Sequence, residues 1–99
     1  MADRRRYEVV LIVDPRLDDQ IIQENLDRYM GIVTDAGGEA VKIDHWGRRR
    51  LAYEIQHLTD GYYILADVVA EPAAMTELDR VLKLADEVMR HRIIRPETN

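Results

Sequence analysis

The spacing of apolar residues along this chain changes repeatedly between the period of a strand and the period of a helix. The run from Tyr7 to Val13 is nearly all Val, Leu and Ile and ends at Asp14-Pro15, which is typical of a short strand buried on both faces. Apolar residues then recur every three or four positions between Asp18 and Ala36, which predicts an amphipathic helix. Gly37-Gly38 is expected to end this helix, because glycine readily adopts the left-handed conformation.

The second half of the chain continues the same kind of pattern. From Glu39 to Ile55 apolar and polar residues alternate, which predicts a long strand with a bulge or bend at Gly47. Thr59-Asp60-Gly61 predicts a turn, and Tyr62 to Val69 predicts another strand. Pro72 is expected to open a second helix. Its buried stripe is predicted at Met75, Leu78, Leu82 and Ala85. The last strand is predicted from Val88 to Ile94.

The resulting order, β-α-β-β-α-β, is that of the ferredoxin-like split unit. We therefore predict an α+β fold with a four-stranded antiparallel sheet and two helices on one face. Residues 1–96 are expected to form a single domain of this kind, and residues 97–99 a short polar tail. Because two helices cover one face only, the second face is expected to meet a partner. The alternative is partial cover by loops and long side chains.

The composition argues against an enzyme. The chain has no cysteine, which excludes disulfides, zinc–thiolate sites and thiol nucleophiles. The three histidines, His45, His57 and His91, lack metal-ligand spacing, and Gly37-Gly38 lacks the later residues of a phosphate-binding loop. We expect no catalytic residue, no metal, no cofactor and no small-molecule substrate. No apolar run resembles a signal peptide or spans a membrane, so the expected location is the cytoplasm.

The arginines point to RNA, although the net charge is −5. Twelve of the 14 basic residues are arginine, and nine of these fall in three clusters. Arginine suits bidentate contacts with phosphate and stacking on bases. The stretch from Trp46 to Tyr53 places three consecutive arginines beside two aromatic residues inside a predicted strand. This pattern favours RNA binding, although a solvated edge strand also uses such charges. The predicted RNA-binding residues are Arg5, Arg6, Arg48, Arg49 and Arg50.

Four blocks of sequence carry a resemblance to a known family. They are Arg5-Arg6-Tyr7-Glu8, the stretch from Trp46 to Ile55, Gly61-Tyr62-Tyr63, and the segment from Val88 to Arg95. In this order they make the chain similar to the bacterial ribosomal small-subunit protein six family. The resemblance implies the same ferredoxin-like fold. It also implies assembly into the central domain of small-subunit ribosomal RNA, as a heterodimer with small-subunit ribosomal protein eighteen.

The open sheet face is expected to meet that partner protein. The predicted partner-interface residues are Trp46, Tyr53, Tyr62, Arg90 and Arg92. Trp46, the single tryptophan, is expected to be an interface anchor. The alternative is a homo-oligomeric ferredoxin-like module, either ligand-binding or a small enzyme, that pairs the open face with its own copy. Such a module would need polar groups that converge from that face, such as Asp44, His45 or Tyr62.

Overall fold

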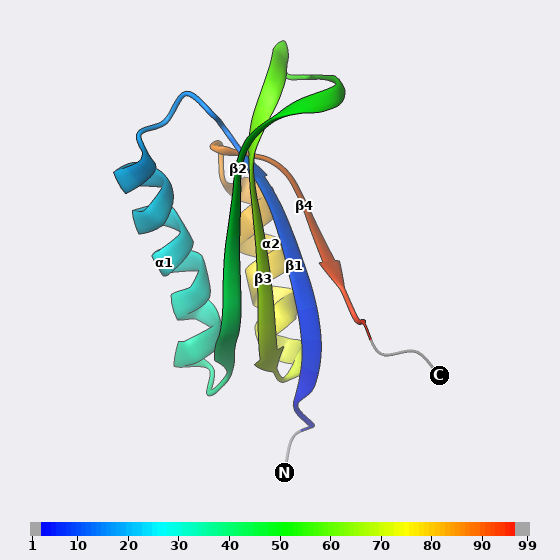
Figure 1. The fold of residues 1–99 in the computed structure, drawn as a ribbon. Coiled ribbons are helices and arrows are strands. Elements are labelled where there is room, and N and C mark those ends of the chain that lie inside the picture. Colours follow the sequence, from blue (N-terminus) through cyan, green and yellow to red (C-terminus); the bar gives the residue numbers. More distant parts are fainter. Residues whose placement is uncertain (1–2, 97–99) are drawn as a thin grey trace.

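The computed structural model describes residues 3–96, in which a four-stranded sheet carries two helices on one side (Figure 1). In chain order the elements are β1 Arg5–Val13, α1 Asp19–Asp35, β2 Glu39–Ile55, β3 Leu58–Ala70, α2 Pro72–Leu84 and β4 Val88–Ile94. The strands lie in the order β2-β3-β1-β4, and every neighbouring pair is antiparallel. The predicted ferredoxin-like fold is confirmed. The expected polar tail, residues 97–99, lies outside the described residues.

One face of the sheet packs against both helices and forms the core. In β1, Val9, Leu11 and Val13 are buried under the helices, whereas Val10 and Ile12 project to the other face and are only partly buried. The prediction of a first strand buried on both faces was therefore wrong, because no helix covers the second face. The buried core side chains come from β1, α1, β3, α2 and β4, whereas β2 adds only the partly buried Ala40 and Ile43. The core includes Ile22, Leu26, Tyr29, Val33, Ile64, Ala66, Val68, Leu78 and Leu82.

The end of α1 follows the prediction closely. Gly37 has a φ of +87°, and its N–H donates to the carbonyl of Thr34 at 3.0 Å. The N–H of Gly38 donates to the carbonyl of Val33 at 2.9 Å. This pair of hydrogen bonds is the Schellman arrangement, which satisfies carbonyl groups left free by the last turn of a helix. The two glycines thus turn the chain from α1 into β2.

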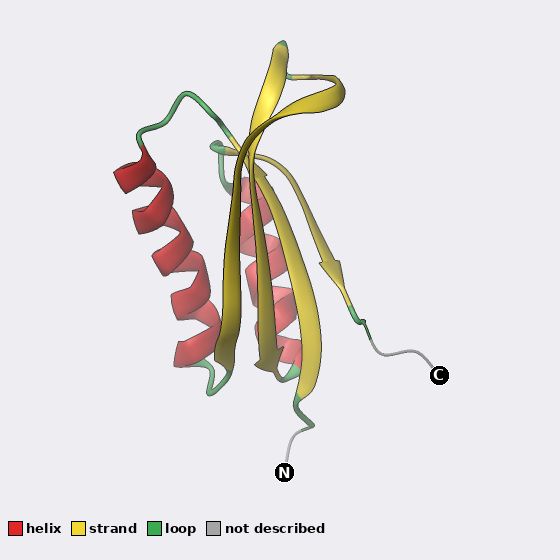
Figure 2. Cartoon of the chain, viewed as in Figure 1, coloured by secondary structure: helices red, strands yellow, loops and turns green. Residues whose placement is uncertain are grey.

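The hairpin of β2 and β3 is longer than the sheet to which it belongs (Figure 2). Val13, the last residue of β1, pairs with Tyr62, and Tyr62 pairs with Arg48 on β2. Beyond this level the hairpin continues as two strands alone. We call residues 48–62 the hairpin arm.

The arm reverses direction at Gln56 and His57, whose φ values are 53° and 66°. Positive φ at both central residues is the mark of the two-residue type I′ turn, which suits the twist of a hairpin. The prediction of a turn at Thr59-Asp60-Gly61 was wrong, because these residues belong to β3.

A β-bulge separates the arm from the sheet. His45 pairs with Ile64 and Gly47 pairs with Tyr63, so Trp46 is the extra residue on β2. Gly47 has a φ of +83°, which side chains other than glycine adopt only with strain. The predicted bulge or bend at Gly47 is confirmed as a bulge.

The arm rises past the end of the sheet and curls there (Figure 1), and its contacts lie on the side of the open face. Leu51 is 7% exposed, and a methyl group added at Gly61 would lie 3.2 Å from Leu51 and 2.4 Å from Ile12. The guanidinium of Arg90 on β4 donates to the hydroxyl of Tyr53 at 2.6 Å. The arm therefore covers the end of the open face around Ile12, and the rest of that face stays uncovered. Of the two alternatives for this face, partial cover applies at one end.

Candidate nucleic-acid interface

The register of the hairpin decides which face each arginine of the arm takes. Directly paired residues of antiparallel strands project to the same face. Arg48 pairs with Tyr62, which is buried on the helix-covered side, and Arg50 pairs with Asp60 on that same side. Arg49 pairs with Gly61 and takes the open side. The three consecutive arginines thus divide between two faces, as period two requires.

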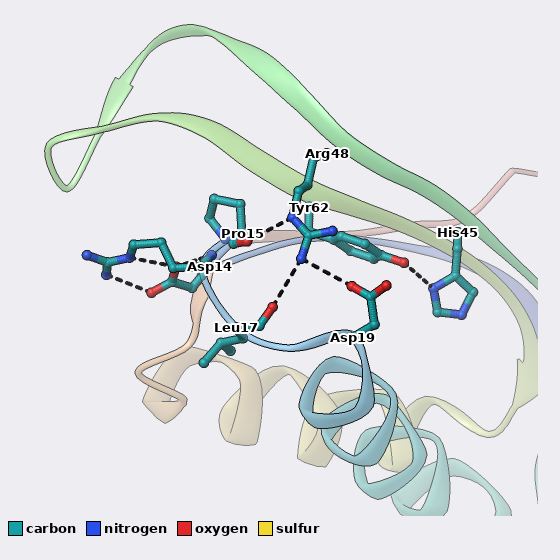
Figure 3. Close-up of polar contacts among 8 residues, drawn as sticks. Asp14, Pro15, Leu17, Asp19, His45, Arg48 and Tyr62 are labelled. Carbon is teal, nitrogen blue, oxygen red and sulfur yellow. Dashed lines mark hydrogen bonds and ion pairs between the residues drawn. The ribbon is translucent and has the colours of Figure 1, made fainter.

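Arg48 is held by the loop between β1 and α1 (Figure 3). Its Nε donates to the carbonyl of Pro15 at 2.9 Å, and its Nη2 donates to the carbonyl of Leu17 and to Asp19, both at 3.1 Å. Since Arg48 contacts two carbonyl groups of the loop and the carboxylate of Asp19 at the start of α1, it fixes the position of the loop against the hairpin. The side chain stays 46% exposed, so one edge of the guanidinium still reaches solvent.

The guanidinium of Arg48 also packs on the aromatic ring of Tyr62. The Cζ atom of Arg48 lies 5.3 Å from the centroid of the Tyr62 ring, within the range of cation–π attraction. The hydroxyl of Tyr62 is 3.0 Å from Nδ1 of His45. Nearby, two hydrogen bonds from the Arg16 guanidinium and one from its backbone N–H hold the pKa of Asp14 below its usual value. These contacts order the loop to which Arg48 binds.

Arg49 and Arg50 are exposed, like Arg48, but no carboxylate among residues 3–96 holds them. Arg49 lies over the indole ring of Trp46, with its Cζ 5.5 Å from the ring centroid. Trp46 is 49% exposed and stacks on Tyr63 at 6.5 Å between centroids and 15° between planes. The side chain of Arg50 makes no hydrogen bond or ion pair with any residue between 3 and 96. Two positive charges beside a partly exposed ring form a surface suited to phosphate and base contacts.

Arg5 and Arg6 lie at the other end of the sheet. Arg5 pairs with Ala70, whereas Arg48 pairs with Tyr62. Eight residues of β3 at about 3.3 Å each separate these positions, which gives a distance of roughly 25 Å. The five predicted RNA-binding arginines therefore do not form one continuous ridge. Arg5 also forms an ion pair with Asp3 at 3.0 Å.

The predicted partner-interface residues are divided as well. Arg90 pairs with Ile12 and Arg92 pairs with Val10, which places both arginines on the open face. Trp46 and Tyr53 border the same face through their contacts with Tyr63 and Arg90. Tyr62 does not lie there: it is 9% exposed and faces the helix-covered side.

A polar pair on the open face was not predicted from the sequence. Glu8 of β1 pairs directly with Asp67 of β3. Both residues interrupt apolar runs at a position where period two expects another apolar side chain. A charged residue at such a position could have identified the pair. It was missed because the segments around Glu8 and Asp67 were each interpreted as continuous apolar strands.

Among residues 3–96, no group of three or more His, Cys, Asp or Glu side chains is placed to hold a metal ion. Within the same residues, none of the helices combines the length and the apolar character needed to span a membrane.

Comparison with known proteins decides the family. The model of the family described as ribosomal protein S6 matches residues 6–95. This chain belongs to the ribosomal protein S6 family. Members of the family are proteins of the small ribosomal subunit, which works in the cytoplasm, and they are not enzymes. The chain is therefore a ribosomal protein and not an enzyme, which confirms the resemblance identified in the sequence.

Two S6 relatives illustrate the similarity. The small ribosomal subunit protein bS6 of Salinispora tropica is 47% identical over 94% of this chain and 97% of its own length. The protein of the same name from Micrococcus luteus is 44% identical over 94% of this chain and 92% of its own length. The crystal structure of 30S ribosomal protein S6 from Thermotoga maritima has the same fold, with a TM-score of 0.87 at 23% identity over 94% of this chain and 88% of that one.

Proposed function

We propose that this chain binds the central domain of small-subunit ribosomal RNA together with small-subunit ribosomal protein eighteen, with which it forms a heterodimer. The observation that carries the RNA part is the exposure of Arg49 and Arg50 on an arm that extends past β1. A folded RNA presents phosphates and 2′-hydroxyl groups in a fixed arrangement. A narrow two-stranded arm can enter such an arrangement where a flat sheet cannot.

The predicted RNA-binding arginines have different roles in this proposal. Arg49 and Arg50 bind phosphates, because neither is held by a carboxylate among residues 3–96. Arg48 positions the arm through its contacts with Pro15, Leu17 and Asp19 and offers one exposed edge to RNA. Arg5 and Arg6 contact a separate part of the RNA, since roughly 25 Å separates them from the arm.

The partner protein occupies the open sheet face. Partly buried apolar side chains lie in the middle of that face, and Trp46 and the two β4 arginines lie at its border. Interfaces of this kind bury an apolar centre inside a polar rim. A basic partner also explains how a chain with a net charge of −5 binds a polyanion, because the heterodimer presents a combined surface. The names of the relatives, which place them in the small ribosomal subunit, support this role. They favour it over the homo-oligomeric module.

A filter-binding experiment tests the proposal. A central-domain fragment of small-subunit ribosomal RNA is titrated with the chain alone, with protein eighteen alone and with both. The proposal expects tight binding only with both proteins present. The Arg49→Ala/Arg50→Ala variant should weaken this binding, and the matched Arg28→Ala/Arg80→Ala variant, which removes two charges from the helices, should not. Failure of the two wild-type proteins to bind together would overturn the proposal.

A further inference from the structure

Two carboxylates face each other in the middle of the open sheet face. Glu8 and Asp67 are directly paired across β1 and β3, so their Cβ atoms are about 5 Å apart. Like charges at directly opposite positions of a sheet are destabilising. Neither carboxylate forms a hydrogen bond or ion pair with a residue between 3 and 96. Lys42, which pairs with Asp67 from β2, forms its ion pair with Asp44 at 3.7 Å. The free chain thus carries two negative charges here that no ion pair within residues 3–96 neutralises.

Asp67 is also partly removed from water. Its Oδ1 atom is buried and has no hydrogen-bond partner within the described residues. A buried acceptor without a donor costs free energy. The Asp67 carboxylate has therefore already lost part of its hydration when the chain folds, before any ion pair forms. A cation that reaches this carboxylate gains more than it would at a fully hydrated one.

The side chains around Glu8 and Asp67 indicate which kind of molecule supplies a cation to them. Val10, Leu65, Val69 and Ile94 are partly buried side chains beside the two carboxylates on the open face. Apolar surface around a charged pair is typical of the centre of a protein–protein interface. Glu8 and Asp67 repel an RNA phosphate at close range, which favours a protein side chain here, although Arg6, Lys42 and Arg92 lie on the same face.

From these observations we infer that the open face receives an arginine or lysine of the partner protein, which binds between Glu8 and Asp67 while apolar neighbours of that residue cover Val10 and Leu65. The inference rests on the proposed heterodimer and specifies its chemistry: the partner surface is apolar with a basic side chain at its centre. The two carboxylates weaken the free chain slightly and select the partner by charge.

Calorimetric titration with protein eighteen tests this inference. Asp67→Asn and Glu8→Gln keep the shape of each side chain and remove one charge. Truncating one member of a charge pair at an interface weakens binding strongly, so each variant should bind protein eighteen about tenfold or more weakly than the wild type. Asp35→Asn is the matched control, because Asp35 is an exposed acid at the end of α1 on the helix side. It should bind like the wild type.

Thermal unfolding of the same proteins separates binding from folding. Because each substitution removes a repulsion between like charges, Asp67→Asn and Glu8→Gln should melt at or above the temperature of the wild type. Weak binding by a protein that is at least as stable as the wild type would support the inference.

Three outcomes would overturn it in different ways. If the wild type binds protein eighteen and both variants bind equally well, the carboxylates have no role and the heterodimer stands without them. If the wild type itself does not bind protein eighteen, the proposed function fails and this inference fails with it. Tighter binding of the central-domain RNA by isolated Asp67→Asn, with binding of protein eighteen unchanged, would make RNA the occupant of this face.

Discussion

Arg48 of β2 and Asp19 of α1 form an ion pair at 3.1 Å, although 29 positions separate them in the sequence. The same guanidinium also donates to the carbonyl groups of Pro15 and Leu17. Arg48 belongs to the run of three arginines that favoured RNA binding, but its contacts are structural. It holds the β1–α1 loop against the base of the hairpin arm.

Replacing Arg48 should lower the free energy of unfolding, whereas replacing Arg50 should leave it nearly unchanged. Arg48→Ala leaves two carbonyl groups and a carboxylate without their donor, and we expect a loss of about 1 kcal/mol in the free energy of unfolding, kept small by solvent screening. Arg50→Ala should change it by less than about 0.5 kcal/mol, because Arg50 has no such contacts. Urea unfolding measures both. Equal stability of the two variants would contradict the role assigned to Arg48.

The hydroxyl of Tyr53 should control how firmly the hairpin arm lies on the open face. Tyr53→Phe keeps the ring near Arg90 but removes the acceptor of the 2.6 Å hydrogen bond. We expect faster amide hydrogen exchange in the arm, with a change of less than about 0.5 kcal/mol in global stability. Exchange at Val9 and Leu11 in β1 serves as the internal control. Unchanged exchange in the arm would show that this hydrogen bond does not hold it.

Two glycines should respond in opposite directions to alanine. At Gly61 the added methyl would lie 2.4 Å from Ile12, and such overpacking should cost about 1–3 kcal/mol. At Gly31, inside α1, the added methyl meets nothing within 4 Å, and the higher helix propensity of alanine should add up to about 1 kcal/mol. Chemical denaturation of the two variants gives the comparison. A stable Gly61→Ala variant would mean that the arm does not approach Ile12 so closely.

Tyr29 should make the protein sensitive to alkaline conditions. Burial, together with a hydrogen bond from its hydroxyl to Glu87, raises the pKa of Tyr29 from 10.0 to about 12. Because the pKa is higher in the folded chain than in the unfolded one, this stabilising contribution is complete below pH 10 and is lost as the pH rises through 12. Urea midpoints measured across this interval should fall more steeply for the wild type than for Tyr29→Phe. Parallel curves would contradict this assignment.

Most of the fold could be predicted because its local signals agree with the tertiary structure. The Val88–Ile94 strand has the predicted bounds, and α1 differs from its prediction by one residue at each end. The turn of the hairpin was missed for a physical reason. Gln56-His57 adopts positive φ without the glycine or asparagine that normally marks such a turn, so Thr59-Asp60-Gly61 gave the stronger local signal.

The candidate site was less predictable, because it depends on register. The sequence shows three arginines in a row, but the bulge at Trp46 decides that Arg48 and Arg50 take one face and Arg49 the other. The distance between Arg5 and the arm depends on the pairing of β1 with β3, which no local pattern reveals. The pairing of Glu8 with Asp67 has the same origin.

The salt dependence of RNA binding by the heterodimer tests the central claim most directly. Each phosphate neutralised contributes roughly one unit to the slope of log affinity against log salt concentration. We predict a steep slope for the wild type with protein eighteen. For Arg49→Ala/Arg50→Ala the slope should be lower by about two units, because each of the two arginines neutralises one phosphate. The Arg28→Ala/Arg80→Ala control should keep the slope of the wild type. An unchanged slope in the arm variant would contradict the account, because the arm would then neutralise no phosphate.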